Sequence, residues 1–558
     1  MNTLSPKMVY GILCDSYELQ QWQVAIIRTL HQNQIEPILV LMPRDTEENH
    51  PSLIQKVFRY PYKNLLFRAY YRFLLKPSAK RTQSAKPFLE DCVLMRCATI
   101  KKGLSEYFEQ RDVEAINASG AQFLLRFGFG IIKGAILESV PYGVWSFHHD
   151  DPEAVRGVPS NFWEILEGYH TNGAILQRLT SKIDAGMVLK QGWFATVSHS
   201  WKANIDQAYW GTVEWPLAIC KQLLAEGNTL GNPQAKLKPS SMRFAPTNST
   251  MIKMLGKMWL NKLAFHFKEL LLTEKWEIGL INRPYADVLM KKAALSADSF
   301  LKGTSKAHYK ADPHLFSYKT ANFVAYEDYD YHDRHGRIFL QELDEALHPK
   351  HQAFKAIERP YHLAFPYVFE HDGKAYCVPE NALGNSLDLY QFDAGTKSFA
   401  FKHTLIKDVA VVDPVVFQFD TKWWLLGTDK SSTNTLLNIW FADDLMGSWQ
   451  PHMLNPVKTD IRSARPAGPV CMVDGRLIRP AQDCAKYSGH RISVMEIETL
   501  TPTQFSEKLL HTLELPSSGL IKGIHTVSGN ESFTAFDQKS HVFVWANFWH
   551  QFKRKLHL

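Results

Sequence analysis

Two short polar segments carry side chains that could exchange protons with a substrate. In the first, an apolar run ends at Ser146, His148 and His149, and an Arg156-Gly157 turn follows. In the second, Asp184 opens a turn in front of another apolar run. Imidazole and carboxylate groups are common acids and bases in catalysis, and loops at strand ends are where a sheet can hold them in place. The pattern therefore predicts a catalytic site built on strand ends.

The hydrophobic pattern supplies the elements that would position these groups. Apolar runs bounded by turn residues indicate strands, and apolar residues at helical spacing indicate helices. The expected elements are strands at 8–14, 35–42, 143–148 and 173–179 and helices at 18–33, 161–168 and 204–225. A strand, a helix and a strand in succession indicate a parallel sheet, so we expect the first half to be an α/β domain.

The run from Ser146 to His149, the Arg156-Gly157 turn and Asp184 together resemble the catalytic core of the folate-dependent formyltransferases. This is the family of methionyl-tRNA formyltransferase and the sugar N-formyltransferases, and the resemblance covers roughly residues 8 to 225. It implies a Rossmann-like fold and N10-formyltetrahydrofolate as co-substrate. It also implies transfer of the formyl group to an amine, which we expect to belong to an amino sugar.

The resemblance also assigns roles to single residues. His148 would take the amine proton or stabilise the tetrahedral intermediate, and Asp184 would hold His148 or the folate nitrogen in the correct protonation state. Ser146 stands where the family has an asparagine that donates a hydrogen bond to the oxyanion, and His149 is the other candidate for that donor. The residues expected to bind formyl-folate are Phe127, Gly128, Phe129, Gly130, Ile131, Arg156 and Gly157.

The second half of the chain contains a repeated hairpin pattern. Residues 365–380, 413–426 and 468–483 each read as a strand, a tight turn and a second strand. The repeats start about fifty residues apart, which is the length of a propeller blade. With residues 276–281 as the incoming strand, the pattern predicts an all-β five-bladed propeller.

Acidic and polar side chains fall near the strand ends of successive repeats, where a propeller points side chains towards its central cavity. From about residue 276 to 540 the chain resembles the five-bladed fold of glycoside hydrolase family 43. Residues 462–468 and 479–484 also resemble the N-terminal domain of plant glucosamine inositolphosphorylceramide transferases. Such acids could cleave a glycosidic bond, hold sugar hydroxyls or cap turns, and we favour sugar binding. The candidate residues are Asp312, Glu380, Asp413, Arg465, Gln482 and Asp483.

Composition excludes several classes of protein. A hydrophobic content of 45% excludes wholesale disorder, and the 7 cysteines are scattered and form no Cys-x-x-Cys pair. The histidines of the second half lack a metal-ligand spacing, so we expect no metal. The first residues lack a signal-peptide pattern and no apolar run reaches the length of a membrane span, so we expect a cytoplasmic protein.

A basic, aromatic segment interrupts the first domain at about residues 55–87 and contains no acidic residue. Such a segment either covers the sheet as a helical insertion or lies on an anionic membrane or phosphate surface. Nucleic acid is the least favoured partner for this segment. A second cationic amphipathic segment at 251–274 adds weight to peripheral contact with the inner membrane surface.

These observations predict a formyltransferase-like domain at 1–240, a linker and amphipathic helix at 241–275 and a five-bladed propeller at 276–558. The main hypothesis is an N-formyltransferase that acts on an amino sugar, a nucleotide sugar or a glycolipid. The alternative is a glycan-binding or glycosidase-like protein whose formyltransferase domain is degenerate, and Ser146 is the residue that favours it. The amine acceptor and the oligomeric state are left open.

Overall fold

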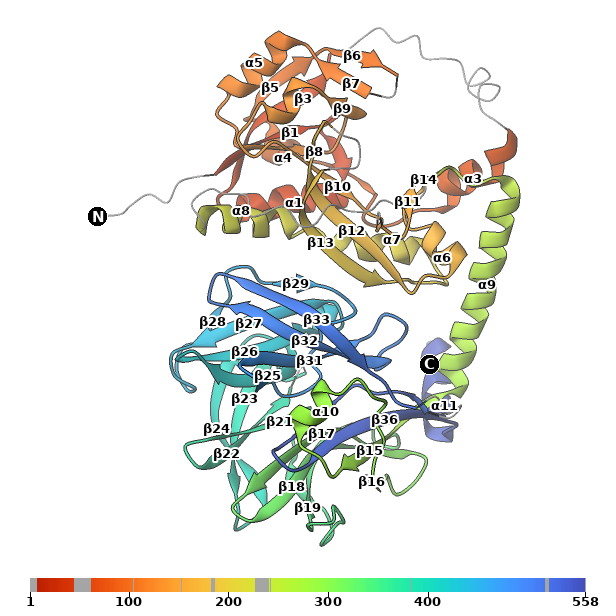
Figure 1. Ribbon diagram of the computed structural model, residues 1–558. Helices are drawn as coiled ribbons and strands as arrows, with labels where there is room; N and C mark the ends of the chain where they lie inside the picture. Colours follow the sequence, from red (N-terminus) through yellow and green to blue (C-terminus); the bar gives the residue numbers. More distant parts are fainter. Residues whose placement is uncertain are drawn as a thin grey trace. The chain divides into compact units, whose positions relative to one another are not determined.

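The computed structural model describes residues 8–44, 62–103, 105–151, 153–181, 186–225, 240, 242–381, 383–516 and 521–556. The chain divides into two compact units, unit 1 from Met1 to Lys262 and unit 2 from Leu263 to Leu558 (Figure 1). Asp184, residues 55–61 of the basic segment and most residues between 226 and 241 lie outside the described part of the chain.

Unit 1 is built on a 7-stranded sheet in the order β13-β12-β10-β8-β1-β3-β5. The strands from β5 to β10 in this order pair in parallel. At one edge β12 pairs antiparallel with β10, and β13 pairs antiparallel with β12. The parallel strands are β1 (Val9–Leu13), β3 (Glu36–Pro43), β5 (Val93–Cys97), β8 (Phe123–Arg126) and β10 (Val144–His148), and the antiparallel ones are β12 (Thr171–Arg178) and β13 (Met187–Ala195).

Apolar side chains cover both faces of this sheet. Phe123 stacks on Trp145 at 4.1 Å between ring centroids, in a core shared with α1 (Gln21–Gln32), α7 (Trp201–Trp210) and α8 (Trp215–Ala225). The neighbouring residue Leu124 points to the opposite face and packs with α5 (Gln110–Ala118). Neighbouring strand residues alternate between faces, so β8 can bury both sides. The result is an α/β layer in which the carboxyl ends of β8 and β10 meet at one edge, the usual place for a ligand.

In the described part of unit 2 the strands form five antiparallel sheets that follow one another along the chain, and the fifth closes the ring because β15 pairs with β36 along its whole length (Figure 1). This arrangement is a five-bladed propeller, as the hairpin repeats predict. The sheets are β17–β20 (His308–Tyr318, Ala321–Asp330, His335–Leu343, Phe354–Ile357), β21–β24 (Ala364–His371, Lys374–Glu380, Ser386–Asp393, Ser398–Lys407), β25–β29 (Val411–Phe419, Lys422–Asp429, Leu436–Ala442, Gln450–Pro451, Lys458–Thr459), β30–β33 (Cys471–Val473, Arg476–Asp483, Arg491–Leu500, Phe505–Leu513), and β15 (Thr273–Ile281), β16 (Ser299–Leu301), β34 (Ile521–Gly523), β35 (Val527–Gly529) and β36 (Thr534–Val542).

The first strand of three sheets is interrupted at the same point by a bulge before a proline. The backbone φ angles of Asp312, Phe365 and Asp413 are 51°, 41° and 49°. These values lie in the left-handed region, which residues other than glycine rarely adopt. Each lies where the strand register shifts against its neighbour. A bulge re-aims the side chain at a strand end, and strained residues gather at functional sites. Two of these three equivalent positions hold an aspartate.

Two further helices carry many exposed apolar side chains. The helix α9 (Asn248–Leu271) falls within the predicted 241–275 segment and contains the boundary between the two units, and α11 (Trp545–Lys555) ends the described chain. The described part of the basic segment includes α3 (Leu65–Ala69) and the π-helix η2 (Tyr70–Leu74). There Tyr70 stacks on Trp201 of the unit 1 core at 5.9 Å, while Phe73 is 73% exposed.

Candidate functional site

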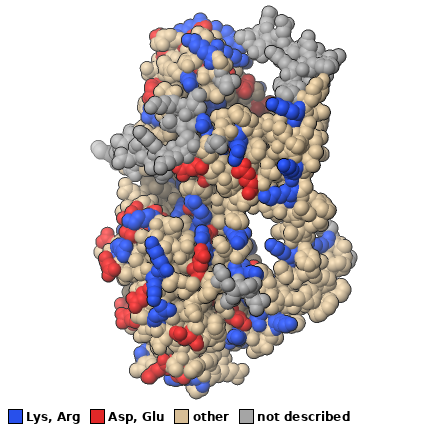
Figure 2. All heavy atoms as spheres, turned by 45° about the vertical axis from the view of Figure 1, so that its right-hand side comes forward, with Lys and Arg blue, Asp and Glu red and all other residues tan. Residues whose placement is uncertain are grey.

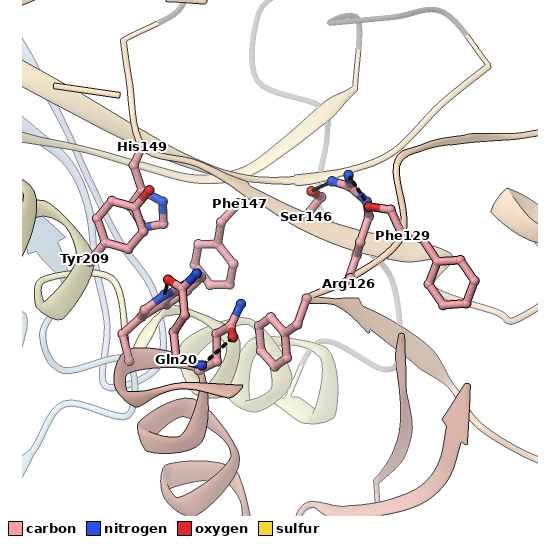
Figure 3. A pocket seen from close by; sticks show the side chains of 11 residues that line it. Gln20, Arg126, Phe129, Ser146, Phe147, His149 and Tyr209 are labelled. Atoms are coloured by element: carbon pink, nitrogen blue, oxygen red, sulfur yellow. Dashed lines mark hydrogen bonds between the residues drawn. The ribbon is translucent and has the colours of Figure 1, made fainter. Parts of the chain in front are cut away.

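A pocket of about 190 Å³ opens in unit 1 where β8 and β10 end and α1 begins (Figure 3). Its volume corresponds to about six water molecules at roughly 30 Å³ each, so it suits a small ligand. The lining residues are Gln20, Trp22, Gln23, Arg126, Phe127, Gly128, Phe129, Ser146, Phe147, His149 and Tyr209. The pocket thus combines aromatic walls with a few polar groups, as ligand pockets commonly do.

Arg126 is the cation of this pocket. Its Nη1 donates to Ser146 Oγ at 3.0 Å, and its Nη2 donates to the carbonyls of Phe129 and Gly130 (Figure 3). Burial lowers the pKa of this guanidinium and outweighs the carboxylates of Glu106 and Asp15, which raise it. A buried cation that faces a pocket suits an anionic ligand.

Ser146 and His149 are both buried in the pocket wall. The Ser146 hydroxyl accepts the hydrogen bond from Arg126. His149 stacks on Tyr209 at 3.6 Å and its Nε2 lies 3.1 Å from the hydroxyl of Thr212. Burial, reinforced by the positive charge of Lys80, holds the pKa of His149 well below 6.5, so the ring is neutral.

Of the other residues predicted from the formyltransferase resemblance, Phe127, Gly128 and Phe129 line the same pocket as Ser146 and His149. His148 is exposed at the end of β10 and does not line the pocket. Arg156 and Gly157 form the short strand β11, which pairs with β14 (Met242–Arg243), and Gly130 and Ile131 also lie outside the pocket lining. Asp184 belongs to the residues that the structure does not describe. The co-substrate N10-formyltetrahydrofolate and the catalytic roles assigned to these residues therefore stay untested predictions.

In unit 2 the structure brings together four of the six predicted propeller residues. Arg465 donates to both carboxylate oxygens of Asp413, from Nε at 2.6 Å and from Nη2 at 3.2 Å. Gln482 donates to the same carboxylate at 2.6 Å, and Glu380 accepts from the backbone N–H of Asp413 at 3.2 Å. These contacts join β22, β25 and β31, so the cluster ties three sheets together at their strand ends.

Asp312 forms a second cluster with three residues that the sequence patterns did not reveal. His525 lies between the carboxylates of Asp312 and Asp537, at 3.1 Å and 2.6 Å. Thr526 donates its hydroxyl to Asp312 at 2.9 Å. Asp312, His525 and Asp537 also form a group whose ligand atoms all lie within 4.8 Å and could hold a metal ion. Burial disfavours the charged form of His525, but the two carboxylates outweigh this effect and raise the pKa of His525. The side chain is therefore protonated at neutral pH.

Burial and neighbouring charges lower the pKa of some acidic residues of unit 2 and raise the pKa of others. Burial disfavours the charge on Asp312, but the imidazolium of His525 outweighs it and lowers the pKa of Asp312 below 3.8. Burial, and then the negative charge of Asp413, raises the pKa of Glu380 well above 4.5. Burial and Asp312 likewise raise the pKa of Glu327, another acid that the repeats did not single out. The unit thus holds ionised and protonated carboxyl groups, which acid–base chemistry needs.

Asp483, the sixth predicted residue, has a different environment. Its carboxylate accepts from Arg491 Nε at 2.8 Å and from the backbone N–H of Ala485 at 3.0 Å. It therefore stabilises the turn after β31. No local sequence pattern identifies His525 or Asp537 as site residues. Each contacts Asp312 across more than 200 residues of sequence, and closure of the propeller ring brings them together.

A family model described as "Glucosamine inositolphosphorylceramide transferase 1, N-terminal" matches residues 261–533, which correspond to most of unit 2. The protein named glucosamine inositolphosphorylceramide transferase 1 of Arabidopsis thaliana is 33% identical over 158 residues, which cover 27% of this chain and 20% of that protein. The protein of the same name from Oryza sativa subsp. japonica is 28% identical over 213 residues, or 37% of this chain and 28% of that protein. The chain thus spans about a fifth to a quarter of the length of these relatives.

Two solved structures share limited similarity with the chain. An exo-β-1,3-galactanase from Clostridium thermocellum has a TM-score of 0.31 and 12% sequence identity, over 38% of this chain and 54% of that one. HypX from Aquifex aeolicus has a TM-score of 0.26 and 16% identity, over 42% of this chain and 30% of that one.

The expectation of a folate-dependent formyltransferase is wrong. The relatives are named as transferases of a different kind, glucosamine inositolphosphorylceramide transferases, and the family model of that name matches residues 261–533. In the described residues no helix is both long enough and apolar enough to cross a membrane.

Proposed function

We propose that unit 2 binds the sugar of a glycoconjugate, and that this recognition is the main function of the chain. The carrying observation is the convergence of Glu380, Asp413 and Arg465 from separate sheets, beside the cluster around Asp312. Charged and amide groups held rigidly at strand ends are suited to fix the hydroxyl groups of a sugar. The proposal involves no formyl transfer.

A glycolipid headgroup is the favoured ligand. Support comes from the family model over residues 261–533, whose description names a glucosamine inositolphosphorylceramide transferase. A headgroup of this kind offers an amine, many hydroxyls and a phosphate. Arg465 would face the anionic part and the carboxylates of Asp312 and Glu380 the hydroxyls or the amine.

Cleavage of a glycosidic bond is a second candidate function. Glu380 holds its proton because burial and Asp413 raise its pKa, whereas Asp312 stays ionised beside His525. A protonated and an ionised carboxyl group are the two partners that glycosidic bond cleavage requires. In this function Glu380 would protonate the leaving oxygen and Asp312 would act as base or nucleophile.

The test measures binding and turnover together on the full chain. Calorimetry with glucosamine, N-acetylglucosamine and a soluble glucosaminyl inositol phosphate should detect binding to the wild type. We expect Asp312→Asn to weaken it by about tenfold or more, since this change removes a charged hydrogen-bond partner. Glu380→Gln should also weaken it, since it replaces a protonated carboxyl group with an amide of different donor geometry. Asp388→Asn is the matched control, because this strand acid contacts only Thr404 and Ser386.

Release of reducing sugar separates the two candidate functions. Binding without release supports recognition, and release that disappears in Glu380→Gln supports cleavage. If the wild type binds none of these probes, or if the control variant loses as much affinity as Glu380→Gln, the proposed site is wrong. Thermal unfolding of each variant verifies that the fold is retained.

A further inference from the structure

Exposed aromatic and aliphatic side chains are concentrated at the end of α9, on α11 and at Phe543 just before it, within unit 2. We call this group the aromatic face. Its rings touch in sequence, with centroids 4.9 Å apart for Phe543 and Trp545, 5.6 Å for Phe548 and Trp549 and 5.8 Å for Trp549 and Phe552. Its most exposed members are Leu263, Phe265, Phe267, Phe543, Trp545, Trp549, Phe552 and Leu556, each between 39% and 65% exposed.

The two helix segments are held together and α11 is fixed to the propeller. Glu269 of α9 forms ion pairs with Arg554 and with Lys555, the latter at 2.8 Å. Asn547 is the buried residue of α11, and its amide donates to Thr273 of β15 at 3.0 Å. The helix therefore buries an asparagine and exposes tryptophans. That is the reverse of a helix that packs on a protein core, so a partner outside the described chain must cover the face.

Charge indicates what this partner is. Helix α11 has no acidic residue and ends in Lys553-Arg554-Lys555, and Lys268 lies on the adjacent end of α9. Figure 2 turns the side of the molecule that carries these helices towards the viewer, and Lys and Arg residues lie there among residues without a formal charge. Tryptophan and phenylalanine beside lysine and arginine are typical of helices that lie in the interface of a membrane with anionic lipids.

We propose that the aromatic face is a membrane-docking surface that inserts its rings at the headgroup level of an anionic bilayer. A second copy of the chain fits less well, because a symmetric contact would bring the Lys553-Arg554-Lys555 ends of both copies to the same interface. The inference goes beyond the proposed sugar binding and holds whether or not the sugar site is correct, because other residues carry it.

The experiment is flotation of the full chain with phosphatidylcholine vesicles, with and without phosphatidylserine. We expect binding only to the anionic vesicles, weaker at high salt, and about tenfold weaker or more in the double variant Trp545→Ala, Trp549→Ala. Lys553→Gln, which removes one cation of α11, should weaken binding to a smaller extent. Phe401→Ala, an aromatic of β24 that is 55% exposed, is the matched control and should bind like the wild type.

Three results would overturn the proposal. One is equal flotation of the wild type and the tryptophan double variant. Another is absence of flotation together with a dimer by light scattering that the double variant abolishes, which would make the aromatic face an interface between copies. The third is absence of both flotation and dimer. Since the tryptophans are exposed, unfolding curves of the double variant should match the wild type and exclude a folding defect.

Discussion

Replacing Arg465 with methionine tests whether the cluster around Asp413 depends on its ion pair. Arg465 supplies two of the three side-chain hydrogen bonds to the Asp413 carboxylate, and the Asp413 side chain is only 2% exposed. Removing the guanidinium leaves a buried carboxylate beside Glu380. Breaking one partner of a buried pair costs about 3–5 kcal/mol, because the remaining charge stays desolvated.

The assay is urea and thermal unfolding of the full chain, monitored through a spectroscopic signal that arises from unit 2. A loss of about 3–5 kcal/mol corresponds to a fall in melting temperature of roughly 10 °C for a domain of this size. The matched control is Arg337→Met, which also breaks two short carboxylate contacts. Its partners Asp333 and Glu358 are 48% and 46% exposed, so the loss should stay below about 1 kcal/mol.

A second variant isolates the cause of the loss. Adding Asp413→Asn to Arg465→Met removes the uncompensated charge, so part of the lost stability should return. Equal losses in Arg465→Met and Arg337→Met would refute the reasoning. A double variant less stable than Arg465→Met alone would also refute it, because the buried charge would then not be the source of the penalty.

Three further predictions concern single residues. Gly128→Ala should destabilise unit 1 by about 2 kcal/mol or more, because a Cβ there would lie 2.7 Å from the backbone nitrogen of Asp15. Gly256→Ala should instead stabilise α9 by roughly 1 kcal/mol, since no atom lies within 4 Å of the added carbon, and paired denaturation curves of the two variants measure both effects. Burial and Asp413 raise the pKa of Glu380 in the folded protein. The protonated carboxyl group therefore contributes its whole share of the free energy of unfolding below pH 4.5, and this contribution is lost as the pH rises through the raised pKa. Unfolding midpoints between pH 5 and pH 9 should therefore shift increasingly in favour of Glu380→Gln as the pH rises, and a constant difference would contradict this assignment.

Local sequence signals determined most of the elements and the class of each unit. Residues 18–33, predicted as a helix, contain α1, and residues 173–179 lie largely within β12. The repeated turns before β22, β26 and β31 predicted the blades, because tight turns between apolar runs have few other solutions. In unit 1, the same kind of reasoning placed Ser146 and His149 at the end of β10, where the pocket is found.

Tertiary structure alone decided which groups meet and what chemistry they can do. Arg126 and Ser146 belong to adjacent parallel strands, and only their side-by-side pairing lets the guanidinium engage the hydroxyl that the sequence pattern had assigned to an oxyanion. Asp312 contacts His525 and Asp537 because β36, near the end of the chain, pairs with β15, the strand that precedes the first sheet. Contacts of this range leave no periodic or spacing signal in a single sequence, since they depend on how whole sheets are arranged and not on the preferences of neighbouring residues.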